Sequence, residues 1–185
     1  MIRGRGKLPI IAVSGPHGSG KSTAARNVAE ILGYEYISAG ELFRDMAEKQ
    51  DMNLEEFSKQ AELKEEIDRY IDNKTLELGK TRDNIVIDAQ LGGWMLKDVA
   101  DMLVYITAPF DVRVQRIAQR ENKQIETIIK ETKTREESEK GRYQKLYKID
   151  ITDLTIYDLI INSDRFNVTE CVEIILTAYN KKNKR

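Results

Sequence analysis

The sequence predicts an α/β fold built on a parallel sheet, and three observations support this prediction. Short apolar runs of four to seven residues alternate with longer segments of helical period. A glycine-rich motif follows the first apolar run directly, where a loop at the end of a strand would lie. The chain has 185 residues, 41% of them hydrophobic, which is enough to form the core of one compact domain. We therefore expect a single domain over residues 1–185, with a five-stranded parallel sheet flanked by helices in three layers.

Five apolar runs account for the strands. They lie at residues 9–14, 35–38, 85–88, 102–107 and 157–161. The first run reads Ile10-Ile11-Ala12-Val13 and has no polar position, which is typical of a strand covered on both faces. We therefore expect this strand to lie inside the sheet.

The segments between the strands have the period of helices. Five of them are predicted as helices, at residues 21–32, from residue 54, at 65–80, at 109–120 and at 124–147. Gly33 suits the end of the first helix, and Asn53 suits the N-cap of the second. Pro109 suits the start of the fourth. The last segment is rich in Lys and Glu, so we expect a helix that is largely solvated.

The composition excludes several classes of protein. The 31 acidic and 30 basic residues nearly cancel, which argues against a chain built for non-specific binding to nucleic acid or anionic membrane. The longest uncharged run, residues 8–20, is too short and too interrupted by Gly and Pro to span a bilayer. The single cysteine, Cys171, cannot form an internal disulfide and suits a reducing compartment as a small core residue. We expect a cytoplasmic monomer that binds small molecules.

The charged residues are unevenly distributed along the chain. Residues 41–88 contain fourteen acidic and eight basic residues, whereas residues 113–148 contain six acidic and eleven basic ones. The two ends, residues 1–7 and 180–185, contain seven basic residues and no acidic one. The segment 113–148 is therefore suited to meeting an anionic ligand, and the basic ends have no assigned role.

One motif carries the chemistry, because it matches the phosphate-binding loop pattern of Gly, four residues and Gly-Lys-Ser/Thr. It comprises Gly15, Pro16, His17, Gly18, Ser19, Gly20, Lys21, Ser22 and Thr23. Glycines let several backbone N–H groups point at phosphate oxygens, and the helix that follows adds its positive end. Lys21 would reach the β- and γ-phosphates, and the Ser22 hydroxyl would bind the Mg²⁺ that accompanies the nucleotide. The motif therefore predicts a P-loop NTPase fold with a nucleotide site at its first loop.

Phosphate binding alone leaves a switch GTPase, a motor-type ATPase and a small-molecule kinase open. A GTPase would carry Asn-Lys-x-Asp for guanine, but the Asn-Lys pairs at residues 73, 122 and 180 lack the aspartate. No Asp-x-x-Gly follows the loop either. His17 is the only histidine, and phosphoryl transfer needs positioning and charge neutralisation more than an imidazole base. The GTPase class is therefore disfavoured, and His17 is assigned to nucleotide binding.

Beyond the second strand the sequence resembles the nucleoside monophosphate kinases. Their Ser/Thr-x-Gly-x-x-x-Arg turn has its counterpart in Ser38, Gly40 and Arg44. The resemblance implies that Ser38 and Gly40 face the acceptor nucleoside and that Arg44 holds its phosphate. The closer likeness is to the archaeal-type cytidylate kinases, and it also places Arg69 with the acceptor. This likeness lies in residues 33–40, 54–58, 66–69 and 93–96.

A second cluster is similar to the lid of adenylate kinase-like enzymes. It consists of Arg116, Arg120, Arg135 and Arg142. The resemblance implies that the first two contact the base and phosphates of ATP, and that the last two close over the transferred group. A guanidinium suits these roles because it can bind two phosphate oxygens at once. The resemblance further implies an acceptor-binding helical insertion at about residues 39–80 and a short lid at about 117–142, with no metal site besides Mg²⁺.

The third predicted strand ends at a departure from the family pattern. Asp88 matches the acidic residue that lies near Mg²⁺ in these kinases and acts through water. The family usually continues with Gly-Arg, whereas this chain continues Ala89-Gln90. An arginine that would help to bind the acceptor is replaced by a neutral amide, so Gln90 leaves the identity of the acceptor base open.

The resemblance as a whole implies a kinase that transfers the γ-phosphoryl group of ATP to CMP or dCMP. The same chemistry on AMP or UMP remains an alternative, because few contacts decide the base. A second alternative, from another class, is a nucleotide-dependent assembly factor with slow ATPase activity. The turn at residues 38–44 separates the two classes, since a factor without an acceptor has no use for Arg44.

Overall fold

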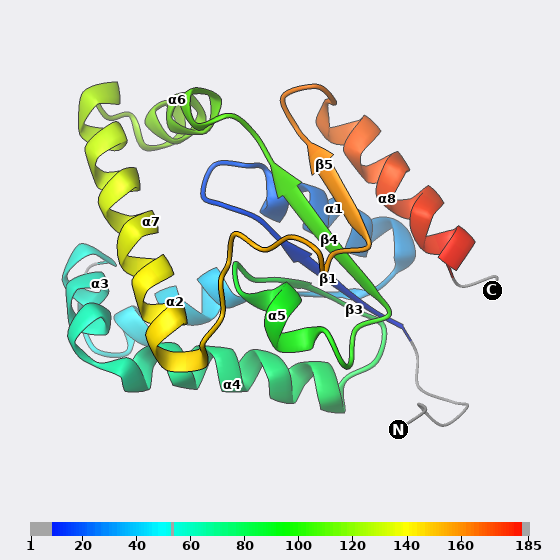
Figure 1. Cartoon of the computed structure of the whole chain (residues 1–185), viewed down its shortest axis with the longest axis horizontal. Helices are drawn as coiled ribbons and strands as arrows, with labels where there is room; N and C mark the ends of the chain where they lie inside the picture. Colours follow the sequence, from blue (N-terminus) through cyan, green and yellow to red (C-terminus); the bar gives the residue numbers. More distant parts are fainter. Residues whose placement is uncertain (1–8, 53, 183–185) are drawn as a thin grey trace.

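The computed structural model describes residues 9–52 and 54–182 and contains a five-stranded parallel sheet between layers of helices (Figure 1). The strands are β1 (Ile10–Ser14), β2 (Glu35–Ser38), β3 (Ile85–Asp88), β4 (Met102–Thr107) and β5 (Leu159–Asn162). Their order in the sheet is β2-β3-β1-β4-β5, and every neighbouring pair is parallel. This architecture confirms the predicted fold class.

Strand β1 lies at the centre of the sheet, with β3 on one side and β4 on the other. Residues 10–13 are completely buried, as their uninterrupted apolar pattern predicts. The chain leaves β1 toward β2 on one side of the sheet and later crosses from β3 to β4 on the other side, and open α/β sheets form ligand crevices where the strand order reverses in this way. The fold therefore places the loop after Ser14 at the mouth of a crevice.

Two helices cover each face of the sheet. Helices α1 (Lys21–Leu32) and α8 (Val168–Lys182) pack on one face over a core that includes Val28, Val104 and Ile175. Helices α4 (Glu65–Thr81) and α5 (Gly92–Leu96) cover the other face over a core that includes Ile87 and Leu96. These two apolar layers hold the strand ends, and thus the crevice, in place.

Two further groups of helices have small cores of their own. Helices α2 (Ala39–Glu48), α3 (Leu54–Leu63) and the first half of α4 pack around Phe57 and Ile67. Helices α6 (Phe110–Glu121) and α7 (Ile125–Tyr147) pack around Val114, Ile117 and Ile128. Both groups lie outside the main cores of the sheet, so small shifts of either would leave the sheet intact.

The structure corrects three details of the sequence analysis. Residues 38–44 are not a turn but the start of α2, because the Ser38 hydroxyl accepts the Glu41 N–H and caps the helix. Strand β5 begins two residues later than predicted, because Tyr157 packs on Tyr105 and Asp158 accepts the Leu103 N–H. Helix α7 is not solvated on all sides, since one face buries Ile128, Thr132, Glu139 and Tyr143. Helices α5 and α8 had not been predicted, and Cys171 lies buried on α8 as expected.

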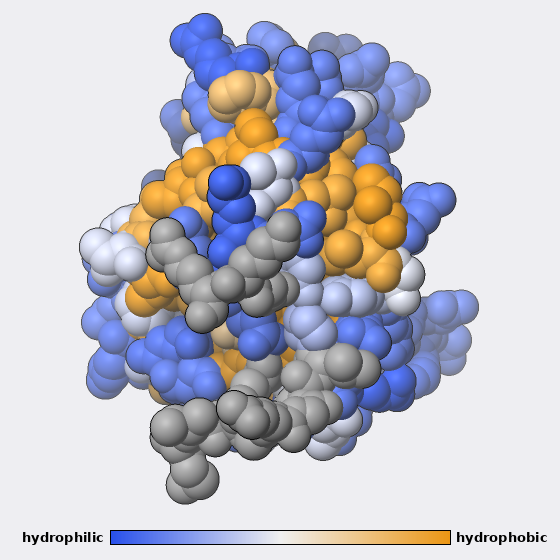
Figure 2. All heavy atoms as spheres, turned by 90° about the vertical axis from the view of Figure 1, so that its right-hand side faces the viewer, coloured by the Kyte–Doolittle hydropathy of each residue, from blue (hydrophilic) through white to orange (hydrophobic). Residues whose placement is uncertain are grey.

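The surface beside α8 is mixed in character. Figure 2 shows this side of the molecule, where apolar residues form a band between hydrophilic residues. Ile160 on the edge strand β5 and Val168 at the start of α8 are among the exposed large apolar side chains. Within residues 9–52 and 54–182, no helix combines the length and apolar character needed to cross a membrane. Asn53, the basic segment 1–7 and residues 183–185 lie outside the described residues, whereas Lys181 and Lys182 lie in the last turn of α8.

Candidate active site

The phosphate-binding loop joins β1 to α1, and its backbone needs glycine at particular positions. Gly15 and Gly18 have φ values of 148° and 77°, which side chains other than glycine rarely adopt. A Cβ atom on Gly18 would lie 2.6 Å from the carbonyl oxygen of Arg113. A Cβ atom on Gly15 would overlap the carbonyl oxygen of Ile106. The loop therefore lies closely against β4 and α6, and only glycine allows this approach.

Side chains from later in the chain anchor the carbonyl groups of this loop. Arg113 donates to the His17 carbonyl at 2.9 Å, and the Ser163 hydroxyl donates to the Ser19 carbonyl at 2.7 Å. The N–H groups of His17 and Gly18 donate to no backbone carbonyl in the described part of the chain. Since the carbonyls are tied to the protein, the N–H groups remain available to an anion at the N-terminus of α1.

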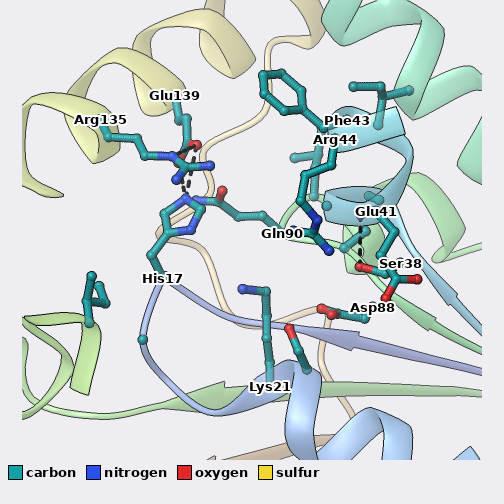
Figure 3. Close-up of a pocket in the computed structure, with 18 of the residues that line it drawn as sticks. His17, Lys21, Ser38, Glu41, Phe43, Arg44, Asp88, Gln90, Arg135 and Glu139 are labelled. Carbon is teal, nitrogen blue, oxygen red and sulfur yellow. Dashed lines mark hydrogen bonds and ion pairs between the residues drawn. The ribbon is translucent and has the colours of Figure 1, made fainter. Parts of the chain in front are cut away.

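A cleft of about 670 Å³ opens beside the loop and is large enough for nucleotide-sized ligands. The loop and α1 form one wall, the ends of β2 and β3 form the floor, and α2, α4 and α7 complete it. Figure 3 shows Lys21, Arg44 and Gln90 reaching into this space from three different elements. Six Lys and Arg side chains line the cleft together with seven Asp and Glu side chains, so the cationic groups are interspersed with carboxylates.

Most of the residues singled out in the sequence line this cleft. They are His17, Gly18, Gly20, Lys21, Ser22, Thr23, Ser38, Gly40, Arg44, Asp88, Gln90, Arg120, Arg135 and Arg142. Five others do not line it. They are Gly15, Pro16, Ser19, Arg69 and Arg116.

The five exceptions have other surroundings. Arg116 donates to the hydroxyl and the carbonyl of Ser163 at 2.9 Å each, so it braces the segment that holds the phosphate loop. The guanidinium of Arg69 lies 5.9 Å from the centre of the Tyr147 ring. Gly15 and Pro16 line a second cavity of about 400 Å³ on the far side of the loop. Ser19 belongs to the loop and is completely buried.

Lys21 and Asp88 lie close together at the floor of the cleft. Burial lowers the pKa of Lys21, and the nearby charge of Asp88 partly opposes this shift. Lys21 has no ion pair within 4 Å among the described residues. One Asp88 oxygen accepts the Tyr36 hydroxyl at 2.9 Å, and the other is buried without a partner. A buried unpaired ammonium and an unpaired carboxylate oxygen are what a nucleotide with its metal ion would satisfy.

The donor set at this place suits Mg²⁺. The unpartnered Asp88 oxygen and the Ser22 hydroxyl are hard oxygen ligands, and both residues line the cleft beside Lys21. In the described part of the chain, no three His, Cys, Asp or Glu residues gather as a metal site of their own. The residues present therefore fit a cation held partly by phosphate oxygens.

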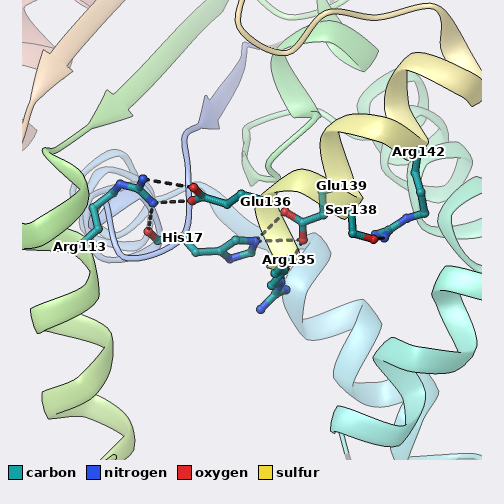
Figure 4. Close-up of polar contacts among 7 residues, drawn as sticks. All are labelled: His17, Arg113, Arg135, Glu136, Ser138, Glu139 and Arg142. Carbon is teal, nitrogen blue, oxygen red and sulfur yellow. Dashed lines mark hydrogen bonds and ion pairs between the residues drawn. The ribbon is translucent and has the colours of Figure 1, made fainter. Parts of the chain in front are cut away.

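A polar network joins the phosphate loop to α7 (Figure 4). The His17 Nε2 lies 3.0 Å from both carboxylate oxygens of Glu139, and Arg135 Nε donates to Glu139 at 3.0 Å. Arg113 forms a two-point ion pair with Glu136, one turn earlier on α7. The loop and α7 are thus connected at two successive turns of the helix.

Charge within this network is balanced without a histidine cation. Burial lowers the pKa of His17, against the opposing effect of Glu139. Burial would raise the pKa of Glu139, but the hydrogen bond from His17 and the charge and hydrogen bond of Arg135 act in the opposite direction, so this pKa lies below its usual range. We infer a neutral His17 that donates from Nε2 to an ionised Glu139, whose charge is met by Arg135. His17 is therefore occupied as a donor and not free to act as a base.

Sequence reasoning missed six acidic residues of the cleft, among them Glu139 on α7 and the pair Asp68 and Asp72 on α4. The Asp68 carboxylate accepts from Arg142 Nε at 2.6 Å. The sequence contains one signal for these residues, which is their spacing. Glu139 follows Arg135 by four residues and Asp72 follows Asp68 by four, so the two residues of each pair lie on the same face of their helix.

A parallel sheet, a phosphate loop with a buried lysine and an arginine-lined cleft beside it define the P-loop kinase class. The chain belongs to the cytidylate kinase-like family, whose model matches residues 10–165. The cytidylate kinase of Archaeoglobus fulgidus is 50% identical over 93% of this chain and 95% of its own. The cytidylate kinase of Sulfurisphaera tokodaii is 44% identical over 92% of this chain and 95% of its own.

Solved structures of lower identity share the fold. A shikimate kinase from Acinetobacter baumannii, solved with shikimate, has a TM-score of 0.65 and 20% identity. The alignment covers 96% of both chains. A gluconokinase from Sinorhizobium meliloti has a TM-score of 0.59 and 15% identity, over 96% of this chain and 94% of that one. At these identities the likeness concerns the fold alone.

Proposed function

We propose that this chain transfers the γ-phosphoryl group of ATP to CMP or dCMP, giving ADP and CDP or dCDP. One observation carries the proposal: Lys21 of the phosphate loop and Arg44 of α2 line the same cleft. A protein that only hydrolyses ATP has no need of a cation for a second anion. The relatives named above are cytidylate kinases, which supports CMP as the acceptor.

On the donor side, the loop from Gly15 to Thr23 holds the phosphates of ATP, and Lys21 lies along them. Ser22 and the unpartnered oxygen of Asp88 would hold Mg²⁺, which would supply charge neutralisation for the phosphate groups. Arg120 lies on the donor phosphates. Arg116 acts through Ser163, by keeping the loop in its binding conformation.

On the acceptor side, Arg44 holds the phosphate of CMP, while Ser38 and Gly40 face its nucleoside. Gln90 takes the place of the family arginine and contributes a neutral hydrogen-bonding group. Arg69 braces this side through the ring of Tyr147. The attacking phosphate oxygen is ionised at neutral pH, so the reaction needs alignment of two anions and no general base. His17 is hydrogen-bonded to Glu139 and does not act as a base, in agreement with a reaction that needs no general base.

The acceptor insertion, about residues 39–80, and the lid, about residues 117–142, close on the substrates. Arg135 and Arg142 then contact the transferred phosphoryl group and neutralise its charge. Closure excludes water, which would otherwise attack ATP. Replacing Arg135 by alanine should therefore lower kcat by about 100- to 1,000-fold, the effect of removing one electrostatic stabiliser. Normal turnover by a folded Arg135→Ala enzyme would contradict the lid assignment.

The deciding experiment measures ADP release from ATP with CMP, dCMP, UMP, AMP and GMP offered separately. We expect CMP and dCMP to raise ADP release far above the ATP-only background, and Lys21→Ala to abolish the increase. If only AMP or UMP raised it, the acceptor would be reassigned within the same chemistry. If no monophosphate raised it, a nucleotide-dependent assembly factor with slow ATPase activity would be the better interpretation.

A further inference from the structure

Tyr36 of β2 lines the cleft, yet it is not among the residues that bind ATP or the acceptor in the proposed function. Its hydroxyl donates to one carboxylate oxygen of Asp88 at 2.9 Å. Among the described residues this is the only hydrogen bond that the Asp88 carboxylate accepts, because its other oxygen is buried without a partner. The orientation of the Asp88 carboxylate therefore depends on Tyr36.

The register of the sheet explains how Tyr36 reaches Asp88. Tyr36 pairs with Val86 of β3, and Asp88 lies two residues further along that strand. Successive side chains alternate between the two faces of a strand, so Val86 and Asp88 lie on the same face. The long tyrosine side chain extends along this face toward the carboxyl end of β3, which borders the cleft.

The ring of Tyr36 is held from the side of α1. The guanidinium carbon of Arg26 lies 4.4 Å from the centre of the ring, an arrangement suited to a cation–π interaction. Arg26 also donates to Glu41 of α2 at 3.0 Å. Since both the ring and the hydroxyl of Tyr36 are engaged in the empty protein, ligand binding does not have to order this side chain again.

The hydrogen bond from Tyr36 occupies one oxygen of Asp88 and leaves the other for a cation. Carboxylates that bind metal ions are commonly oriented in this way by a hydrogen bond to their other oxygen. Burial, with the charge of Asp88, raises the pKa of Tyr36 to about 12, so the hydroxyl keeps its proton and remains a donor at neutral pH. The contact thus has the geometry and the protonation state of a support for a metal ligand.

Resting on the proposed function, we propose that Tyr36 is a positioning residue of the metal site: its hydroxyl fixes the Asp88 carboxylate so that the free oxygen faces the Mg²⁺ that accompanies ATP. In this role Tyr36 acts through Asp88, whereas Ser22 would bind the cation directly. Removing the hydroxyl should therefore weaken the contribution of Mg²⁺ to nucleotide binding and leave the contacts of the phosphate loop intact.

Tyr36→Phe tests this role because it deletes only the hydroxyl oxygen. Phenylalanine keeps the ring for Arg26 and for the apolar core on this face of the sheet. Calorimetry on the full-length proteins measures the Kd of the non-hydrolysable β,γ-imido analogue of ATP, once in Mg²⁺ and once in EDTA. The ratio of the two Kd values is the gain in affinity that the metal provides. We expect this gain to be about tenfold smaller in Tyr36→Phe, with an unchanged Kd in EDTA.

Tyr34→Phe is the matched control. The hydroxyl of Tyr34 lies 2.9 Å from the hydroxyl of Tyr179 on α8, so this variant also loses one tyrosine hydroxyl contact, close to the start of β2. It should keep the full metal-dependent gain. A gain that falls equally in both variants would reflect the loss of any tyrosine hydroxyl and would overturn the inference.

Kinetics with CMP supply a second measurement. Tyr36→Phe should regain most of its lost rate when Mg²⁺ is raised well above the ATP concentration, whereas a damaged fold would lower the rate at every Mg²⁺ concentration. A metal-dependent gain in Tyr36→Phe equal to that of the unaltered protein overturns the inference, and so does the absence of any gain in the unaltered protein. Calorimetry needs no acceptor, so absence of CMP phosphorylation by the unaltered enzyme overturns the proposed function instead.

Discussion

Replacing Asp72 by asparagine should stabilise the protein relative to the unaltered chain as the pH rises. Burial, with the added charge of Asp68, raises the pKa of Asp72 from its ordinary value of 3.8 to about 7 in the folded chain. Between these two values the folded state holds a proton that the unfolded state has released. The free energy of unfolding therefore decreases as the pH rises from about 4 to about 7.

The size of this effect follows from the shift in pKa. Each pH unit across this window changes the free energy of unfolding by about 1.4 kcal/mol, so raising the pH from 5 to 8 should cost about 3 kcal/mol through Asp72 alone. Asparagine does not ionise, so the free energy of unfolding of Asp72→Asn lacks this decrease with pH. Relative to the unaltered protein, the variant should gain about 3 kcal/mol between pH 5 and pH 8, or roughly 5–10 °C in melting temperature.

Urea denaturation of both proteins at pH 5 and pH 8, followed by circular dichroism, measures this difference. Asp83→Asn, at an exposed position just beyond the end of α4, is the control for the loss of one carboxylate. A stability difference between the two proteins that does not change with pH would refute the argument that Asp72 is buried with an unmet charge.

Other predictions concern the phosphate loop and its surroundings. Lys21→Ala should lower kcat by about 100- to 1,000-fold without lowering the melting temperature, because it removes a buried unpaired ammonium; a large loss of stability would contradict this view of Lys21. Asp88→Asn should raise the Mg²⁺ concentration needed for half-maximal rate, and an unaltered Mg²⁺ titration would remove Asp88 from the metal site. His17→Ala should lower the free energy of unfolding by about 1–3 kcal/mol, measured in urea, because Glu139 loses a buried donor; its activity should not show the loss expected for a catalytic base. Gly15→Ala should cost more than about 2 kcal/mol in the same assay, because its Cβ overlaps the Ile106 carbonyl.

Local patterns predicted most of the secondary structure. The uninterrupted apolar run at residues 10–13 indicated a buried strand, and α1 begins and ends where the loop motif and Gly33 predicted. Helix α2 was missed because its first residues were interpreted as a turn, although Ser38 is a good N-cap. Helix α7 was interpreted as solvated because Lys and Glu dominate its composition, whereas its buried face carries only a few residues, among them Glu139.

The candidate site was predictable where its residues are contiguous. The phosphate loop combines backbone geometry, a lysine and a hydroxyl within nine residues, so its chemistry is readable without knowing what packs around it. The roles of the arginines were harder to predict from the sequence. Arg116 carries the same charge as Arg135, yet only the fold shows that it is engaged with Ser163, 47 residues later, and does not line the cleft.

The sequence alone determined the fold class, the phosphate loop and the likeness to the cytidylate kinase-like family, because these depend on short-range periodicity and on contiguous motifs. The tertiary structure decided which charges are paired and which are free. Asp68 and Asp72 lie one helical turn apart and look alike in the sequence, but Arg142 forms an ion pair with the first and not with the second. Burial and pairing are set by residues that are distant along the chain, and they decide whether a carboxylate supports the fold or stays available for a ligand.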